Sequence, residues 1–99
     1  MTTRTALTKA KRGAAFLDAK LGRGWRRKIR RRDLDMQRYT YFKGECGCIL
    51  AQLHGDYGTG ADTLGISDAE CVTLGLEQGP GASYGELTEA WLEVLREKA

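Results

Sequence analysis

Apolar residues return at intervals of three and four along much of this chain, and that spacing places them on one face of an α-helix. The first such stretch covers residues 5–21, and Gly22 and Gly24 end it. We expect this helix to bury a stripe formed by Leu7, Ala10, Ala14, Leu17 and Leu21. Phe16 lies on the opposite side, so either a neighbouring loop covers it or it contacts a partner.

A second apolar stripe begins near the middle of the chain. It consists of Cys46, Ile49, Leu50, Leu53 and Tyr57. The stretch GDYGTG, residues 55–60, is typical of a glycine-rich loop and ends this helix.

Two capping boxes, each a serine followed three residues later by glutamate, predict where the last helices begin. Ser67 and Glu70 open a helix over residues 68–76, with Ala69, Val72 and Leu76 facing inward. Ser83 and Glu86 open the last helix, which runs to about residue 98 after a break at residues 77–82. Its core face carries Tyr84, Leu87, Trp91, Val94 and Leu95.

Residues 23–43, which follow the first helix and precede the second apolar stripe, have a less regular pattern. Residues 23–32 predict a short helix, with Trp25 and Ile29 one turn apart on one face. Residues 33–43 alternate apolar and polar positions and predict an extended connector or a lone strand. We therefore expect a single all-α domain over residues 1–99, a compact bundle of four to five short helices with an extended basic and aromatic connector.

Charge is divided unevenly along the chain. Residues 1–43 hold 14 basic and three acidic side chains, whereas residues 44–99 hold two basic and ten acidic ones. The densest basic stretch lies within residues 23–32 and comprises Arg23, Arg26, Arg27, Lys28, Arg30, Arg31 and Arg32. Such a split indicates either a charged partner or two halves of the fold that face each other.

The spacing of four glutamates in the last helix predicts an acidic face opposite the apolar one, formed by Glu86, Glu89, Glu93 and Glu97. Like charges at these spacings weaken a helix by a few tenths of a kcal/mol per pair. The face is either simply solvated, or it meets a basic surface of the same chain or of a second copy.

No arrangement of residues predicts catalysis or a cofactor. His54 is the only histidine, the two serines serve as helix caps, and GTG lacks the lysine of a phosphate-binding loop. The potential zinc ligands are Cys46, Cys48, His54 and Cys71. Because Cys46 and Cys48 point about 200° apart on a regular helix, we favour buried, apolar cysteines over zinc. A reactive Cys48 thiol at a helix start is the third interpretation.

The motifs GAAFLDAKLGRGW, RDLD, CGCILAQLHGDYGTGADTLGIS and LGLEQGPGASYGELTEAWLEVL resemble a family of small proteins of actinobacteria and their phages. The resemblance spans residues 13–95 and implies an origin, because no activity accompanies it. It marks Trp25, Leu34, Cys48, Gln52, Leu53, Gly55, Tyr57, Leu64, Tyr84, Leu87 and Trp91. Among these, Gln52 is a polar residue on an apolar helix, and we expect it to hydrogen-bond the loop at residues 55–60. The chain departs from the family in Ala51, where we expect glycine, and in its basic run.

These observations predict a small, non-catalytic, phage-type accessory protein that acts by binding. The partner is a protein, either a second copy or a host protein, and the contact surface is the basic stretch with Phe16, Tyr39 and Tyr41. The alternative is nucleic acid, whose phosphates the basic side chains would neutralise and whose bases the tyrosines would stack against. No apolar run is long enough to cross a membrane, no small-molecule substrate is evident, and we expect a cytoplasmic location in a bacterial host cell.

Overall fold

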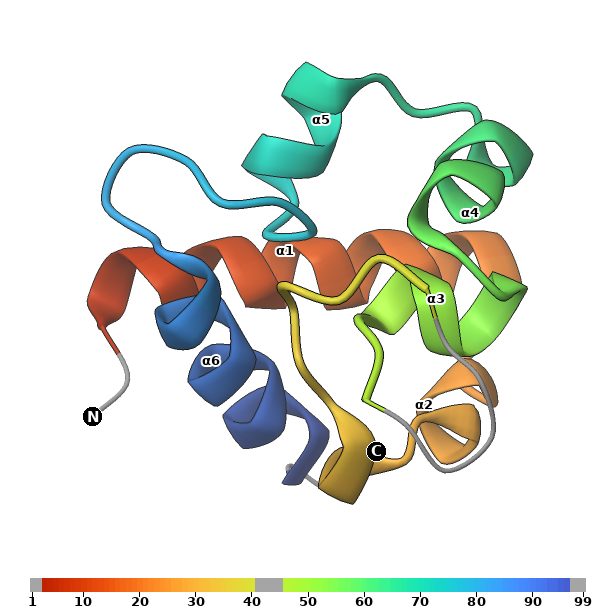
Figure 1. Ribbon diagram of the computed structural model, residues 1–99, viewed down its shortest axis with the longest axis horizontal. Coiled ribbons are helices and arrows are strands. Elements are labelled where there is room, and N and C mark those ends of the chain that lie inside the picture. Colours follow the sequence, from red (N-terminus) through yellow and green to blue (C-terminus); the bar gives the residue numbers. More distant parts are fainter. Residues whose placement is uncertain (1–2, 41–45, 97–99) are drawn as a thin grey trace.

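A computed structural model of the chain describes residues 3–40 and 46–96. Helix α1 (Arg4–Leu21) is the longest element and crosses the molecule, and α6 (Tyr84–Arg96) packs against it (Figure 1). Thr3 caps α1 by accepting a hydrogen bond from the Ala6 amide at 3.2 Å. The buried face of α1 consists mostly of small residues, which lets α6 approach closely: Ala6, Ala10, Gly13, Ala14 and Leu17.

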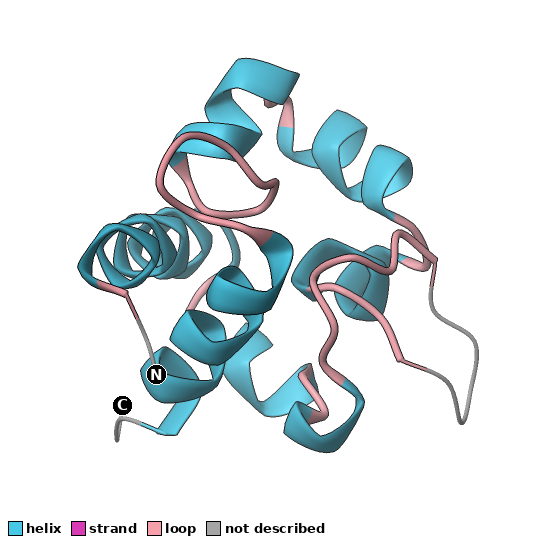
Figure 2. Cartoon of the chain, turned by 60° about the vertical axis from the view of Figure 1, so that its left-hand side comes forward, coloured by secondary structure: helices cyan, strands magenta, loops and turns pink. Residues whose placement is uncertain are grey.

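Five short elements complete the fold. In chain order they are α2 (Trp25–Lys28), the 3₁₀ turn η1 (Arg31–Asp33), α3 (Ile49–His54), α4 (Tyr57–Leu64) and α5 (Asp68–Thr73). Residues 34–40 form an extended connector held by isolated bridges, a parallel one from Leu34 to Gly47 and an antiparallel one from Thr40 to Asp56. The described residues therefore form helices and loops (Figure 2), which confirms the prediction of an all-α domain.

The two tryptophans meet in the core, where their rings pack edge to face with centres 6.2 Å apart. Each indole N–H has a partner, because Trp91 donates to the Gly75 carbonyl at 2.7 Å and Trp25 donates to Asp18 at 2.8 Å. The pair joins α2 to α6, and it sets the position of α2 at one end of α1.

The prediction of a loop at residues 55–60 is wrong. Asp56 caps a new helix, α4, by accepting hydrogen bonds from the amide and hydroxyl of Thr59 at 2.7 and 2.9 Å. Gly60 lies inside this helix, where a Cβ atom would come within 2.9 Å of Leu50. The absence of a side chain at Gly60 therefore lets α4 pack closely on α3. With α4, the described residues form six α-helices, where the sequence predicts four to five.

Other boundaries also differ from the prediction. Cys46 was expected in the buried stripe but is exposed, because α3 starts at Ile49 with Cys48 as its N-cap. Leu21 was also expected inside but is 42% exposed, since it is the last residue of α1. Helix α5 ends at Thr73, before the predicted residue 76. Ala69, predicted to face inward, is exposed, and Cys71 is the buried residue of this helix.

Both predicted capping boxes are confirmed. The Ser67 hydroxyl accepts a hydrogen bond from the Glu70 amide at 3.2 Å, and the Glu70 carboxylate accepts one from the Ser67 amide at 3.1 Å. Ser83 and Glu86 make the same reciprocal pair at the start of α6. No helix among the described residues is long and apolar enough to cross a membrane.

Candidate binding surface

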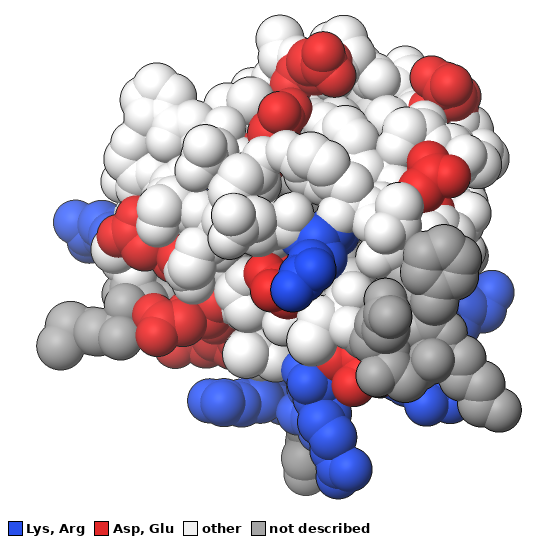
Figure 3. Space-filling view, viewed as in Figure 1, with Lys and Arg blue, Asp and Glu red and all other residues white. Residues whose placement is uncertain are grey.

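Helix α2 and turn η1 divide the basic stretch into an inner and an outer side. Trp25 and Ile29 are buried, so the remaining side chains of this stretch project away from the core. Six of them are exposed, and we call them the basic edge: Arg23, Arg27, Lys28, Arg30, Arg31 and Arg32. Lysine and arginine side chains gather along the lower side of the molecule in Figure 3, where α2 and η1 lie in Figure 1.

Arg26 is the member of the stretch that is already engaged. Its guanidinium donates to Asp18 through Nε at 3.2 Å and Nη2 at 2.9 Å, and the same carboxylate accepts from the Trp25 indole. The Arg26 hydrogen bond is the main reason why the pKa of Asp18 lies below its ordinary value. Arg26 therefore positions Trp25, with its guanidinium carbon 5.5 Å from that ring's centre, and contributes little to the exposed charge.

Gln52, on α3, holds the backbone of the basic edge through hydrogen bonds to Arg30. Its side-chain oxygen accepts from the Arg30 amide at 2.7 Å, and its nitrogen donates to the carbonyls of Arg30 and Gly47, each at 3.2 Å. The expected hydrogen bond from Gln52 to residues 55–60 is therefore replaced by contacts with a segment 22 residues away. These bonds tie the basic edge to α3 at the backbone of Arg30.

The exposed arginines are not neutralised by carboxylates of the described part of the chain. Between described residues, ion pairs join Arg26 to Asp18 at 2.9 Å and Arg38 to Asp35 at 3.9 Å, and neither pair involves the basic edge. The hollow at η1, about 380 Å³ in volume, is lined by Arg30, Arg31, Arg32 and Asp33. The basic edge thus presents positive charge to solvent.

The acidic residues of α6 lie in less uniform surroundings than the sequence predicts. Glu86 is partly buried and belongs to the Ser83 capping box, and the Ser83 amide lowers the pKa of its carboxyl. Glu89 is exposed and Glu93 is partly buried, whereas Glu97 lies outside the described residues. The three glutamates that the structure describes therefore do not form one uniformly exposed ridge on α6.

The aromatic residues proposed for contact also differ from one another. Tyr39 is 43% exposed, but its ring packs against Tyr57, with centres 5.1 Å apart, and its hydroxyl hydrogen-bonds that of Tyr84. Phe16 is partly buried against the core, with the Lys20 ammonium 5.8 Å from its ring centre. Tyr41 lies outside the described residues.

The cysteines and the histidine lie in separate environments. Cys48 and Cys71 are buried, and burial raises the pKa of both thiols. The interpretation of Cys48 as a reactive thiol is therefore wrong, because desolvation outweighs the helix start. His54 ends α3, and no three potential metal ligands among residues 3–40 and 46–96 are grouped to hold an ion.

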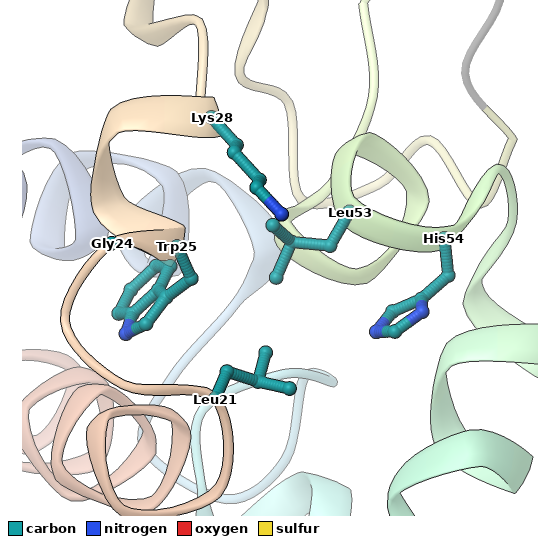
Figure 4. Close-up of a pocket in the computed structure, with 6 residues that line it drawn as sticks. All are labelled: Leu21, Gly24, Trp25, Lys28, Leu53 and His54. Carbon is teal, nitrogen blue, oxygen red and sulfur yellow. The ribbon is translucent and has the colours of Figure 1, made fainter.

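A pocket of about 240 Å³ lies between α2 and α3, beside the basic edge. It is lined by Leu21, Gly24, Trp25, Lys28, Leu53 and His54, and Figure 4 shows Lys28 extending from α2 toward Leu53. The buried His54 Nε2 has no hydrogen-bond partner among the described residues. The sequence does not predict this pocket, and the local signal for it is Leu21, an apolar residue at a helix end followed by Gly22.

No family model, curated protein or solved structure matches this chain. The resemblance to small actinobacterial and phage proteins therefore stays a prediction.

Proposed function

We propose that this chain is a non-catalytic, phage-type accessory protein that binds an acidic surface of another protein through its basic edge. The observation that carries the proposal is six exposed cations on a segment whose backbone is fixed by Gln52 and whose neighbour Arg26 is held by Asp18. Opposite charge across an interface speeds association and fixes orientation. A cationic segment that forms no ion pair with the described carboxylates, and whose backbone is held at Arg30, is suited to that role.

One feature favours a protein partner over nucleic acid, and another bears on whether that partner is a second copy. An apolar surface that includes Leu21 adjoins the basic edge, and proteins bury apolar groups together with charge at their interfaces. In addition, Glu86 on the acidic helix is already engaged by Ser83. One carboxylate of the acidic helix is therefore less available to the basic edge of a second copy.

Nucleic acid is the second candidate for the same surface. It is favoured by Tyr39, an exposed aromatic ring on the connector that follows the basic edge. Because Tyr57 packs against that ring, stacking with a base is restricted to its remaining surface. Binding through phosphates alone would weaken steeply between about 50 and about 200 mM salt.

A charge-reversal experiment tests the proposal. We expect the native chain to bind a fluorescent polyglutamate peptide, measured by anisotropy at about 50 mM salt, where electrostatic attraction is weakly screened. Changing Arg27→Glu, Arg31→Glu and Arg32→Glu together should weaken this binding at least about tenfold, because attraction becomes repulsion. The matched control changes Arg4, Lys11 and Arg12, three exposed bases on α1, to glutamate.

The control separates a local surface from overall charge, since both triple variants have the same net charge. Equal weakening in the two variants, or no binding by the native chain, would contradict the proposal. A single-stranded oligonucleotide with the same charge as the peptide is measured in parallel. If the oligonucleotide binds and the peptide does not, the partner is nucleic acid. Sedimentation of the native chain over a range of concentrations tests self-association, which would make a second copy the partner.

A further inference from the structure

The pocket between α2 and α3 has firmly placed walls. On one wall, Trp25 is held by its indole hydrogen bond to Asp18. On the other, the three hydrogen bonds of Gln52 keep α3, which carries Leu53 and His54, against the backbone of the basic edge. A site whose walls are already ordered loses little conformational freedom when a ligand enters, which favours binding.

The size and lining of the pocket suit one apolar side chain. Its volume, about 240 Å³, falls below the range of about 300–1,000 Å³ typical of pockets for drug-sized ligands. Leu53 and Leu21 supply apolar surface, whereas Trp25 also lines the pocket but is buried. Leu21 is one of two large apolar residues among the described ones that remain strongly exposed. A side chain placed here would remove the Leu21 surface from water.

The charge beside the pocket indicates what flanks that side chain. Lys28 belongs to both the pocket lining and the basic edge, and Arg27 is exposed next to it on α2. An apolar group that enters here brings its neighbouring residues against these cations. A carboxylate next to the apolar residue, on the side that faces α2, is therefore the complement of this region.

We propose that this pocket receives one leucine-sized apolar side chain of the acidic partner, with an aspartate or glutamate next to it in that partner. The inference rests on the proposed function and adds to it a point of specificity. The basic edge attracts acidic surfaces in general, whereas the pocket selects those that carry an apolar residue among their carboxylates.

Two synthetic peptides test the inference: a short polyglutamate with a central leucine and the same peptide with a central alanine. We expect the leucine peptide to bind about tenfold more tightly, because the larger side chain buries more apolar surface in the pocket. In nuclear magnetic resonance spectra, the leucine peptide alone should shift the methyl signals of Leu21 and Leu53 and the indole signal of Trp25.

A matched pair of variants tests whether the pocket causes the difference. Gly24 lines the pocket and has right-handed helical dihedrals (φ −59°, ψ −20°), and a Cβ atom there meets nothing within 4 Å. We therefore expect the side chain of Gly24→Leu to fit without strain and to compete with a ligand for the pocket. Gly85, in the first turn of α6, is equally open and does not line the pocket. We expect Gly24→Leu to abolish the preference for leucine and Gly85→Leu to retain it.

The outcomes distinguish this inference from the proposed function. If both peptides bind the native chain equally, the pocket has no such role, while acidic binding by the basic edge stands. If the preference survives in Gly24→Leu, the apolar side chain binds elsewhere and the inference is overturned. If neither peptide binds at about 50 mM salt, the proposed function fails and the inference fails with it.

Discussion

Asp18 connects helix α1 to the segment that carries the basic edge. Its carboxylate accepts one hydrogen bond from the Trp25 indole and two from the Arg26 guanidinium, at distances of 2.8 to 3.2 Å. Charge-assisted bonds of this kind are roughly twice as strong as neutral ones. Besides its packing against Trp91, the position of Trp25 therefore depends on a carboxylate of the preceding helix.

Replacing Asp18 tests this dependence. Because the pKa of Asp18 is lowered in the folded state, its charge stabilises the fold above the unfolded-state value of about 3.9 and less so as pH falls through the folded-state pKa. We expect Asp18→Asn to reduce the free energy of unfolding by about 1–2 kcal/mol at pH 7, and the difference to shrink toward pH 2. Urea unfolding at both pH values measures it, with the exposed Asp62→Asn as control. An equal difference at both pH values would contradict this role.

Gln52 is the second residue on which the basic edge depends. Gln52→Ala removes its hydrogen bonds to Arg30 and Gly47, each contributing about 1 kcal/mol in a typical protein. We expect this variant to lose about 1–3 kcal/mol of unfolding free energy and to exchange the Arg30 amide hydrogen faster. The control is Gln78→Ala, at an exposed site. Unchanged exchange at Arg30 would show that other contacts hold this backbone.

At the scale of elements, the pairing of α1 and α6 depends on the absence of a side chain at residue 13. A Cβ atom on Gly13 would lie 2.1 Å from the Leu74 carbonyl oxygen and 2.7 Å from the Trp91 ring. Distances this short force the backbone or the ring to move. Gly13 therefore allows Trp91 and the turn after α5 to approach α1.

The same substitution at two helical glycines tests that requirement. We expect Gly13→Ala to lower the free energy of unfolding by about 1–3 kcal/mol or more through overpacking. Gly85→Ala should leave it unchanged or raise it by up to about 1 kcal/mol, because Gly85 has open space and alanine favours a helix. Chemical unfolding of both variants measures the contrast. Similar free energies would mean that α1 and α6 adjust without cost.

Short helices in this fold depend on their caps more than on their length. Helices α3 and α5 have six residues each, well below the length at which isolated helices are stable in water. Their first turns are closed by Cys48 and by Ser67. Tertiary packing and these caps together explain why such short segments are helical.

At the scale of the whole molecule, the three cysteines report on cooperative unfolding. Cys46 is exposed, whereas Cys48 and Cys71 are buried and have raised thiol pKa values. We expect a disulfide reagent at pH 7 to modify Cys46 rapidly and the other two only at the rate of unfolding, because the thiolate is the reactive form. The Cys46→Ser variant should lose the fast phase alone. A second fast thiol would indicate local opening near α3 or α5.

At the same scale, charged side chains are spread unevenly over the face shown in Figure 3. Positive side chains gather along its lower side, while acidic ones lie across its upper part and also next to the positive ones below (Figure 3). The sequence shows the division along the chain, but it leaves open whether the two halves neutralise each other. In the described residues the basic edge forms no ion pair with α6.

Local patterns were enough to determine the helical class and several boundaries. The spacing of apolar residues placed α1 and α6, and the capping boxes of Ser67 and Ser83 placed the starts of α5 and α6. Each of these features depends on residues within about one helical turn of each other. Such interactions are visible in the sequence because the atoms involved are neighbours along the chain.

Tertiary structure alone decided the features that make the candidate surface. The contact of Gln52 with Arg30 joins residues 22 positions apart, and the pocket combines α1, α2 and α3. The helix at residues 57–64 persists despite its glycines because Gly60 packs closely on Leu50. Such contacts depend on how distant segments approach one another, and therefore on packing that no local pattern records.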